Sequence, residues 1–255
     1  MGSRVAQLIL ETEGIELAAA FERPDHPLIG KDLSEAVGGG SLGKAVSKGI
    51  REVLEQSDVV IDFTSASASL EHFRDASHSG TPMVIGSTGF KPDQLSEIRT
   101  LAQRAAVVLA PNMSVGVNVL FKVVGDIARL LGDDFDVEIV EAHHRFKKDA
   151  PSGTAIKLAQ VMAQALGRDL DQVGVYARHG LTGERTGSEI GIQTVRGGDI
   201  VGEHTVLFAG MGERIEIVHR AQSRDNFARG AIRAAKWVVG QPPGFYDMGD
   251  VLCLK

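Results

Sequence analysis

Short apolar runs alternate with segments of helical pattern in the N-terminal half of the chain, and this alternation limits the possible folds more than any other feature. The apolar runs, each suited to a buried parallel strand, are 58–64, 82–86 and 106–110. Helical patterns occupy 69–79 and 93–103 between them. Such short connections predict an α/β fold with a Rossmann-like, doubly wound parallel sheet.

The first fifty residues predict an earlier part of the same sheet. Residues 4–12 have the pattern of the later part of a helix, which Gly14 ends. The apolar run 15–21 predicts a buried parallel strand, and 24–49 predicts an irregular surface loop. A sheet of this kind begins with a strand and a glycine-rich turn before the first helix, so we expect about 16 further residues ahead of Met1.

The pattern changes after residue 114. A long apolar helix is predicted over 115–131, and period-2 patterning typical of strands follows in 189–196, 204–209 and 213–219. Gly210-Met211-Gly212 joins the last two as a hairpin signal.

These patterns predict a second domain of α+β type with a mixed sheet, over 115–224. A closing helix over 226–239 is expected to pack back onto the first domain. The first domain then comprises 1–114 together with 225–255.

A dense group of basic residues follows the predicted strand 135–142, in a chain whose formal net charge is −6. The group comprises His143, His144, Arg145, Lys147 and Lys148. Clustered cations attract small anions, and histidine and lysine can also donate protons. The sequence therefore predicts a catalytic pocket that binds a carboxylate.

Ser152-Gly153-Thr154 supports this prediction, because it opens an apolar-periodic helix over 155–166 with an Asp or Ser cap. The free N–H groups of a helix N-terminus favour a bound anion. The alternative interpretation is a solvated basic turn that precedes an ordinary capped helix.

Three turns after predicted strands could contact a dinucleotide. Glu22 could bind a ribose hydroxyl and Arg23 a 2′-phosphate, although the pair could also be a simple polar exit from a strand. The turns Gly86-Ser87-Thr88-Gly89-Phe90 and Ala110-Pro111-Asn112-Met113-Ser114 carry small, hydroxyl and amide groups that could contact the nicotinamide and its ribose.

Composition excludes several classes of protein. The sequence pI near 5.8 argues against a nucleic-acid-binding role. Cys253 is the single cysteine, so an intrachain disulfide and a cysteine-based metal site are both excluded, which fits a reducing compartment. No metal site is predicted. The sequence contains neither a transmembrane run nor a signal-peptide pattern, and we expect a cytoplasmic protein.

Several motifs together resemble the 4-hydroxy-tetrahydrodipicolinate reductase family, also called the dihydrodipicolinate reductase family. The most specific is EAHHRFKKDAPSGTA at 141–155. The others are FER at 21–23, IDFT at 61–64, GSTGF at 86–90, NMSVGVN at 112–118 and RGGDIVGEH at 196–204. The resemblance extends over nearly the whole chain.

The resemblance implies an oxidoreductase that uses NADH or NADPH to reduce a small cyclic dicarboxylate in diaminopimelate and lysine biosynthesis. It implies that His143 is a proton donor or acceptor, that Lys147 is a proton donor, and that His144, Gly153 and Thr154 bind the substrate. The implied cofactor contacts are Glu22, Arg23, Gly86, Ser87, Thr88, Ala110, Pro111, Asn112 and Met113.

The resemblance also implies that the first domain binds the dinucleotide and that the second binds substrate and forms a homotetramer. Two other hypotheses remain open. Another two-domain NAD(P) oxidoreductase would share the fold but would not need the basic group before Ser-Gly-Thr. A dinucleotide-binding protein with impaired catalysis would retain the fold alone.

Overall fold

The computed structural model describes residues 1–254, which form two compact units. Unit 1 combines Met1–Val115 with the C-terminal segment that starts at Asp225, and unit 2 is Gly116–Arg224. Unit 2 is therefore an insertion within unit 1. Among the described residues, none of the helices has both the length and the apolar character that a membrane crossing requires.

Unit 1 is built on a parallel sheet with the strand order β1-β2-β3-β9. The strands are β1 (Val60–Asp62), β2 (Met83–Ile85), β3 (Ala106–Leu109) and β9 (Gly244–Tyr246). The predicted parallel sheet is confirmed, and β9 is an addition that the sequence pattern does not indicate. Asp62 pairs with Ile85 and Ile85 with Leu109, so the carboxyl ends of β1, β2 and β3 meet at one edge.

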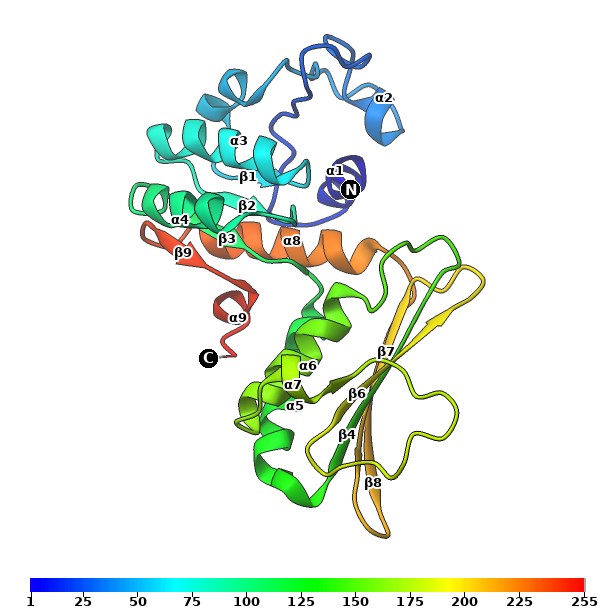
Figure 1. Ribbon diagram of the computed structural model, residues 1–255. Coiled ribbons are helices and arrows are strands. Elements are labelled where there is room, and N and C mark those ends of the chain that lie inside the picture. The colour runs from blue at the N-terminus through cyan, green and yellow to red at the C-terminus, as the bar shows by residue number, and fades with distance from the viewer. Residues whose placement is uncertain (255) are drawn as a thin grey trace. The chain divides into compact units, whose positions relative to one another are not determined.

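Helices cover both faces of this sheet (Figure 1). They are α1 (Gly2–Leu10), α2 (Ser34–Val37), α3 (Ala66–Ser79), α4 (Pro92–Leu101), α8 (Asp225–Val238) and α9 (Met248–Val251), with short 3₁₀ turns at Ile50–Glu52 and Leu54–Gln56. Successive residues of a strand point to opposite faces. Met83 and Ile85 therefore pack in the cluster under α3 and α4, whereas Val84 packs against α8.

The prediction of a strand over 15–21 is wrong. Only Phe21 forms a β-bridge, with Ser47, and 15–20 have no ladder partner. A strand needs a neighbouring strand to pair its backbone groups, and β1 pairs only with β2 in the described sheet. The apolar side chains of the segment are used in packing instead, and Leu17 joins the core cluster around α1.

The segment 24–49 is mostly irregular, as predicted, but it is not merely a surface loop. It contains α2, and Leu33, Val37 and Val46 are buried in the same cluster as Leu17. The local pattern of prolines and glycines does not reveal this packing, because the apolar residues have no regular period.

Unit 2 contains a five-stranded mixed sheet in the order β5-β6-β4-β7-β8. The strands are β4 (Asp136–His143), β5 (Gly174–Val175), β6 (Ile190–Arg196), β7 (Gly202–Ala209) and β8 (Arg214–Ala221). Strands β5, β6 and β4 are parallel, while β7 is antiparallel to both β4 and β8. The predicted mixed sheet and the hairpin at Gly210-Met211-Gly212 are confirmed.

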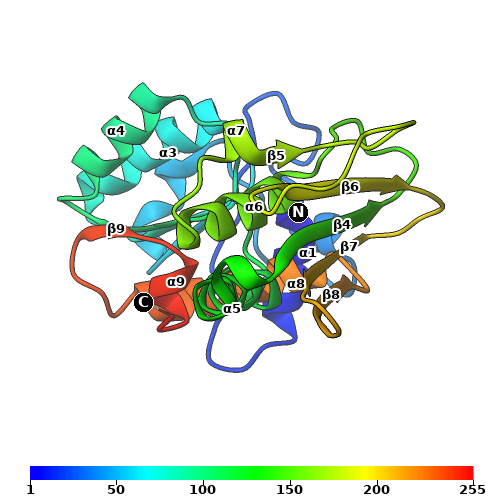
Figure 2. The same ribbon diagram turned by 60° about the horizontal axis from the view of Figure 1, so that its bottom comes forward.

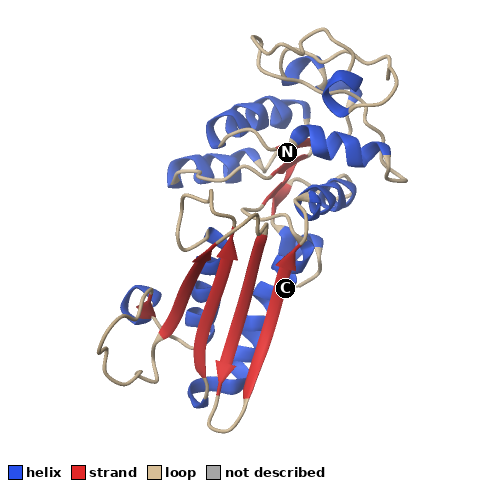
Figure 3. Cartoon of the chain, turned by 90° about the vertical axis from the view of Figure 1, so that its right-hand side faces the viewer, coloured by secondary structure: helices blue, strands red, loops and turns tan. Residues whose placement is uncertain are grey.

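The helices of unit 2 lie on one face of this sheet, and no helix of the unit covers the other face, which we call the open face (Figures 2 and 3). They are α5 (Val115–Leu131), α6 (Gly153–Ala165) and α7 (Leu170–Val173), with a 3₁₀ turn at Gly132–Asp134. Val137 and Ile139 of β4 are completely buried under α5 and α6. Val140, of opposite parity, lies on the open face, as do Val195 and Val218, which are 46% and 40% exposed.

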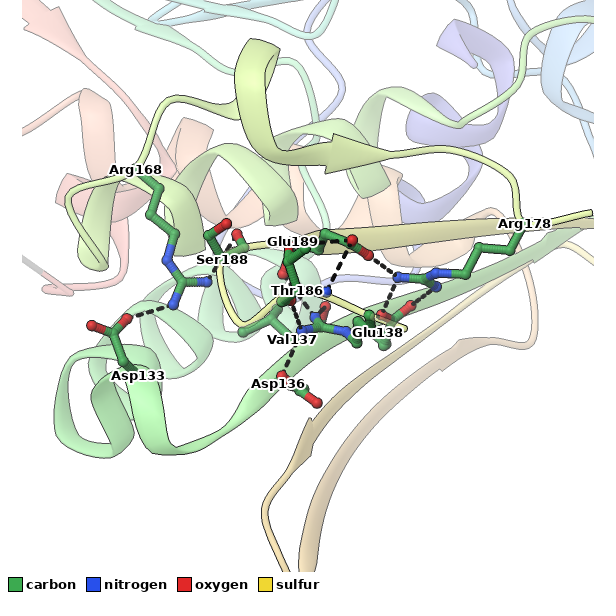
Figure 4. Close-up of polar contacts among 10 residues, drawn as sticks. Asp133, Asp136, Val137, Glu138, Arg168, Arg178, Thr186, Ser188 and Glu189 are labelled. Atoms are coloured by element: carbon green, nitrogen blue, oxygen red, sulfur yellow. Dashed lines mark hydrogen bonds and ion pairs between the residues drawn. The ribbon is translucent and has the colours of Figure 1, made fainter. Parts of the chain in front are cut away.

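An ion-pair network ties the long connection from β5 to β6 onto β4 (Figure 4). Arg178 forms a bidentate pair with Glu138, at 2.8 and 3.0 Å, and also binds Glu189. Arg185 binds Glu138 as well. The Glu138 carboxylate occupies the space that a side chain at Gly191 would need, since a Cβ there would lie 1.8 Å from it. A side chain at this position would therefore displace the Glu138 carboxylate from its arginine partners.

Candidate active site

Strand β4 ends in the two residues around which the site is built, Glu141 and His143. Glu141 has the same parity as Val137 and Ile139, so its side chain enters the helix-covered side of the sheet and is completely buried. Its oxygens are bound by His143 Nδ1 (2.6 Å), the two terminal nitrogens of Arg196 (2.8 Å each), the Ser152 N–H (3.0 Å) and the Thr194 hydroxyl (3.2 Å). Every lone pair of this carboxylate is therefore engaged.

These contacts determine the charges of the pair. Burial alone would raise the pKa of the Glu141 carboxyl, but Arg196, His143 and the Ser152 N–H outweigh it and lower the pKa to about 2. Burial lowers the pKa of His143, although Glu141 opposes that effect. At neutral pH the pair is thus a carboxylate and a neutral imidazole. Because the carboxylate can only accept, His143 must donate its Nδ1–H, which leaves Nε2 with a free lone pair.

Helix α6 begins next to this pair. Ser152 is its N-cap, and the Ser152 hydroxyl accepts a hydrogen bond from the Ala155 N–H at 3.1 Å. Gly153 and Thr154 form the first turn, and the space beside Gly153 is open. An uncrowded helix N-terminus is a favourable position for a carboxylate.

His204 of β7 contacts the N-cap of the same helix. Its Nε2 lies 3.0 Å from the Ser152 hydroxyl, and its ring is 5.3 Å from that of His143 in an edge-to-face arrangement. Burial, reinforced by the charge that His143 carries when it is protonated, lowers the pKa of His204 to about 4. A neutral His204 therefore packs beneath the site without adding charge to it.

The basic turn between β4 and α6 carries Lys147, whose ammonium binds both oxygens of Asp149 at 2.8 Å. This hydrogen bond from Lys147 lowers the pKa of Asp149. Arg196 also reaches the turn, since its Nη2 donates to the Asp149 carbonyl at 2.7 Å. Lys147 is close enough to His143 for its charge to contribute to the lowered pKa of that histidine.

The structure separates the members of the predicted basic group. His143, Lys147 and the start of α6 at Gly153 and Thr154 gather at one end of the sheet, whereas Arg145 and Lys148 are exposed. His144 is partly buried, and its Nδ1 is buried without a hydrogen-bond partner among the described residues.

Sequence reasoning missed Glu141, Arg196 and His204 as members of the site. One signal was present for Glu141, because a glutamate with the parity of two core residues in an apolar strand must enter the core. Arg196 and His204 reach the site through strand register, since Glu141 pairs with Thr194 on one side and with His204 on the other.

A second polar cluster lies at the carboxyl edge of the unit 1 sheet. Asp62, whose side chain is completely buried, is bound by His72 Nδ1 at 2.6 Å and by the Thr64 hydroxyl at 2.6 Å. Burial alone would raise the pKa of Asp62, but these partners lower it. Ser69 binds both Asp62 (3.0 Å) and Ser87 (2.8 Å), so the buried carboxylate is linked to the turn after β2.

The predicted cofactor turns converge on this edge. Gly86 and Ser87 directly follow β2, and a Cβ at Gly86 would lie 2.1 Å from the Phe63 ring, so a side chain there would displace that ring. Glu22 and Arg23 are exposed and follow Phe21, whose ring packs edge-to-face on His72 at 4.9 Å.

The remaining predicted cofactor residues differ in their access to solvent. Thr88 and Pro111 are exposed and Asn112 is partly exposed. Ala110 and Met113 are buried in the core cluster under α8, so their side chains cannot reach a ligand without leaving the core. Contact with a ligand is left to their backbone groups, of which the Ala110 N–H already donates to the Ile85 carbonyl at 3.3 Å. Among residues 1–254, no group of three or more His, Cys, Asp or Glu side chains is arranged to hold a metal ion.

Two family descriptions match the chain. Residues 1–113 match "Dihydrodipicolinate reductase, N-terminus", and residues 116–252 match "Dihydrodipicolinate reductase, C-terminus". Proteins named 4-hydroxy-tetrahydrodipicolinate reductase are similar over almost the whole chain. The protein from Syntrophobacter fumaroxidans is 69% identical, over 100% of this chain and 96% of the relative. That from Syntrophus aciditrophicus is 58% identical, over 99% and 94%.

Solved structures agree with these sequence matches. Dipicolinate-bound dihydrodipicolinate reductase from Paenisporosarcina sp. TG-14 is similar with a TM-score of 0.75 and 26% identity, over 96% of this chain and 92% of that chain. An amine dehydrogenase from Mycobacterium smegmatis, with a TM-score of 0.58 and 16% identity over 96% and 91%, shares the fold.

Proposed function

The chain belongs to the dihydrodipicolinate reductase family, and from this premise we propose that it reduces 4-hydroxy-tetrahydrodipicolinate to tetrahydrodipicolinate with NADH or NADPH, in diaminopimelate and lysine biosynthesis. One observation on this chain's own residues supports the proposal. The buried Glu141–His143 pair stands beside the open N-terminus of α6, which combines a group for proton transfer with a site for an anion.

Substrate binding is assigned to His144, Gly153 and Thr154. The substrate carries two carboxylates, and dipicolinate, which is bound to the solved relative from Paenisporosarcina sp. TG-14, is also a dicarboxylate. Backbone N–H groups at the start of α6 offer hydrogen bonds and the positive end of a helix dipole. The partly buried His144 side chain is assigned as a further group that binds a carboxylate.

His143 and Lys147 are assigned to proton transfer. The Lys147 ammonium, which Asp149 holds at 2.8 Å, donates a proton to the ring carbon next to the one that is reduced. His143 keeps Nε2 free, so it can accept or return a proton at that atom. A general acid in contact with the substrate accelerates such a step by about 10²–10⁴-fold.

Unit 1 is assigned to the dinucleotide. NADH or NADPH, when bound, supplies the hydride. The residues at the sheet edge fit such a cofactor, because exposed Glu22 can accept from a ribose hydroxyl and exposed Arg23 can pair with a 2′-phosphate. Gly86, Ser87, Thr88, Pro111 and Asn112 are assigned to the rest of the cofactor, with Ala110 and Met113 contributing backbone groups.

A homotetramer is proposed to form through the open face of the unit 2 sheet. Val140, Val195 and Val218 lie on that face, which no helix of unit 2 covers. The protein is assigned to the cytoplasm, where its free Cys253 would remain reduced.

Steady-state turnover of wild type, Lys147→Ala and Lys148→Ala tests the function and the role of Lys147 together. We expect NAD(P)H oxidation by wild type with the named substrate, and a fall in kcat of about 10²–10⁴-fold in Lys147→Ala. Lys148→Ala is the matched control, because Lys148 is the adjacent lysine in the same turn but its side chain is exposed. Cofactor affinity, measured by titration calorimetry, should be the same in all three proteins.

Two results would contradict these assignments separately. Absence of turnover in wild type would reject the proposed reaction. Turnover in wild type with a near-normal kcat in Lys147→Ala would keep the reaction but remove Lys147 as its acid.

A further inference from the structure

We propose that Glu141 is the positioning residue of this site, and that one buried carboxylate aligns His143, the N-terminus of α6 and the turn that carries Lys147. This inference rests on the proposed function for its catalytic consequence. The orientation and the tautomer of the His143 ring, which the proposal also specifies, can be tested without any reaction.

The contacts of Glu141 come from three different parts of unit 2. Within β4 it binds His143 Nδ1 at 2.6 Å. Across the turn it accepts from the Ser152 N–H at 3.0 Å, so it is bonded to the N-cap of α6. From β6 it receives Arg196 through two nitrogens at 2.8 Å each. Loss of the carboxylate charge would therefore weaken the contacts with His143, with the N-cap of α6 and with Arg196.

Arg196 extends this alignment to the lysine turn. Its Nη2 donates both to Glu141 and to the Asp149 carbonyl, at 2.8 and 2.7 Å, and the Asp149 carboxylate in turn binds Lys147. Both terminal nitrogens of the guanidinium are already bound to protein oxygens, so Arg196 is poorly placed to bind a ligand. We assign it to structure, as the partner that keeps a buried carboxylate charged.

The bond to Glu141 also selects the tautomer of His143. A carboxylate offers no proton, so the neutral ring places its hydrogen on Nδ1 and presents the lone pair of Nε2. The backbone leaves room for that atom at Gly202, where a Cβ would lie 3.0 Å from Nε2. Glu141 touches neither the open space at Gly153 nor solvent, and it acts only through the groups it holds.

Nitrogen-15 NMR of histidine-labelled protein, without substrate, is the direct test. In wild type we expect His143 to show the pure Nδ1–H tautomer at neutral pH. In Glu141→Gln we expect a mixture of tautomers and a lower pKa of His143, because the charge that favours its protonated form is gone. We also expect a fall in kcat of about 10²-fold, as misplacement of a reacting group produces.

Glu138→Gln is the matched control. Glu138 is another glutamate of β4 that pairs with arginines, but it has the opposite parity and faces away from His143. Its substitution should leave the His143 signals and the pH profile of kcat unchanged.

An Nε2–H tautomer in wild type would overturn the proposal, and this measurement requires no variant to fold. A folded Glu141→Gln protein with the wild-type tautomer and kcat would overturn it as well. If wild type shows the expected tautomer but no reductase turnover, the positioning stands and the proposed function fails.

Discussion

At the scale of single residues, His204 connects the site to the stability of the protein. It is 4% exposed, its Nδ1 is buried without a partner among the described residues, and burial lowers its pKa from 6.5 to about 4. The unfolded chain therefore binds more protons than the native one between these two values. The groups that face it are His143, Glu141, His219 and Lys147.

Stability should accordingly rise with pH between about 4 and 6.5. Acidification from pH 7 to 4 should reduce the free energy of unfolding by up to about 3 kcal/mol through this one group. Urea titrations at several pH values would measure the effect. In His204→Gln the pH dependence should be smaller, while His179→Gln, at an exposed position, should keep it. Equal slopes in all three proteins would assign the acid sensitivity to other groups.

At the scale of elements, the packing of α8 depends on a glycine. A Cβ at Gly230 would lie 1.8 Å from the Met113 carbonyl oxygen, which belongs to the backbone and cannot rotate away. The helix and the turn after β3 must separate if a side chain is added. Because this turn contains residues assigned to the cofactor, the contact also determines where they stand.

Gly230→Ala should therefore be destabilising, although alanine is the better helix former by about 1 kcal/mol. Overpacking costs about 1–3 kcal/mol, and a clash with backbone at this distance puts the cost at or above the upper end of that range. After the gain in helix propensity we therefore expect a net loss of about 2 kcal/mol and a thermal midpoint about 4–8 °C lower. Gly240→Ala, whose Cβ would meet its nearest atom at 3.9 Å, should have little effect in the same calorimetric scan. Equal thermal midpoints for the two variants would show that the turn at Met113 can move away from α8 at little cost in stability.

Most elements could be predicted because their periodicity is a local property of the chain. Helix α5 has the predicted bounds, and β4 differs from its prediction by one residue at each end. Residues 15–21 were misassigned because an apolar run becomes a strand only with a partner. The three residues of β9 are a strand because β3 offers them an edge, which their sequence does not show.

The same distinction holds for the site. His143, Lys147 and Gly153 could be selected from the sequence because they lie in one contiguous motif. Arg196 and His204 could not, because their role arises from the register of β6 and β7 against β4. Local pattern gives the parity of a strand but does not identify its neighbours.

At the scale of the whole molecule, the proposed tetramer gives the open sheet face of unit 2 a function. Val218→Arg would place a long charged side chain in the middle of the proposed contact, where its bulk and its desolvation oppose association. We expect a smaller sedimenting species in analytical ultracentrifugation. Leu130→Arg, at an 85% exposed position of α5, should leave the assembly intact. An unchanged mass for Val218→Arg would place the subunit contacts elsewhere.

The insertion of unit 2 into unit 1 has a consequence for biosynthesis. The ribosome releases residues 116–224 before the segment that begins at Asp225, so unit 2 can fold while α8 and β9 are still being translated. During that interval Val84 and Val108 lack the helix that covers them, and β3 has an unpaired edge. The nascent chain thus exposes an incomplete sheet, with uncovered valines and an unpaired edge, until α8 and β9 have been translated, and such exposed surfaces favour aggregation.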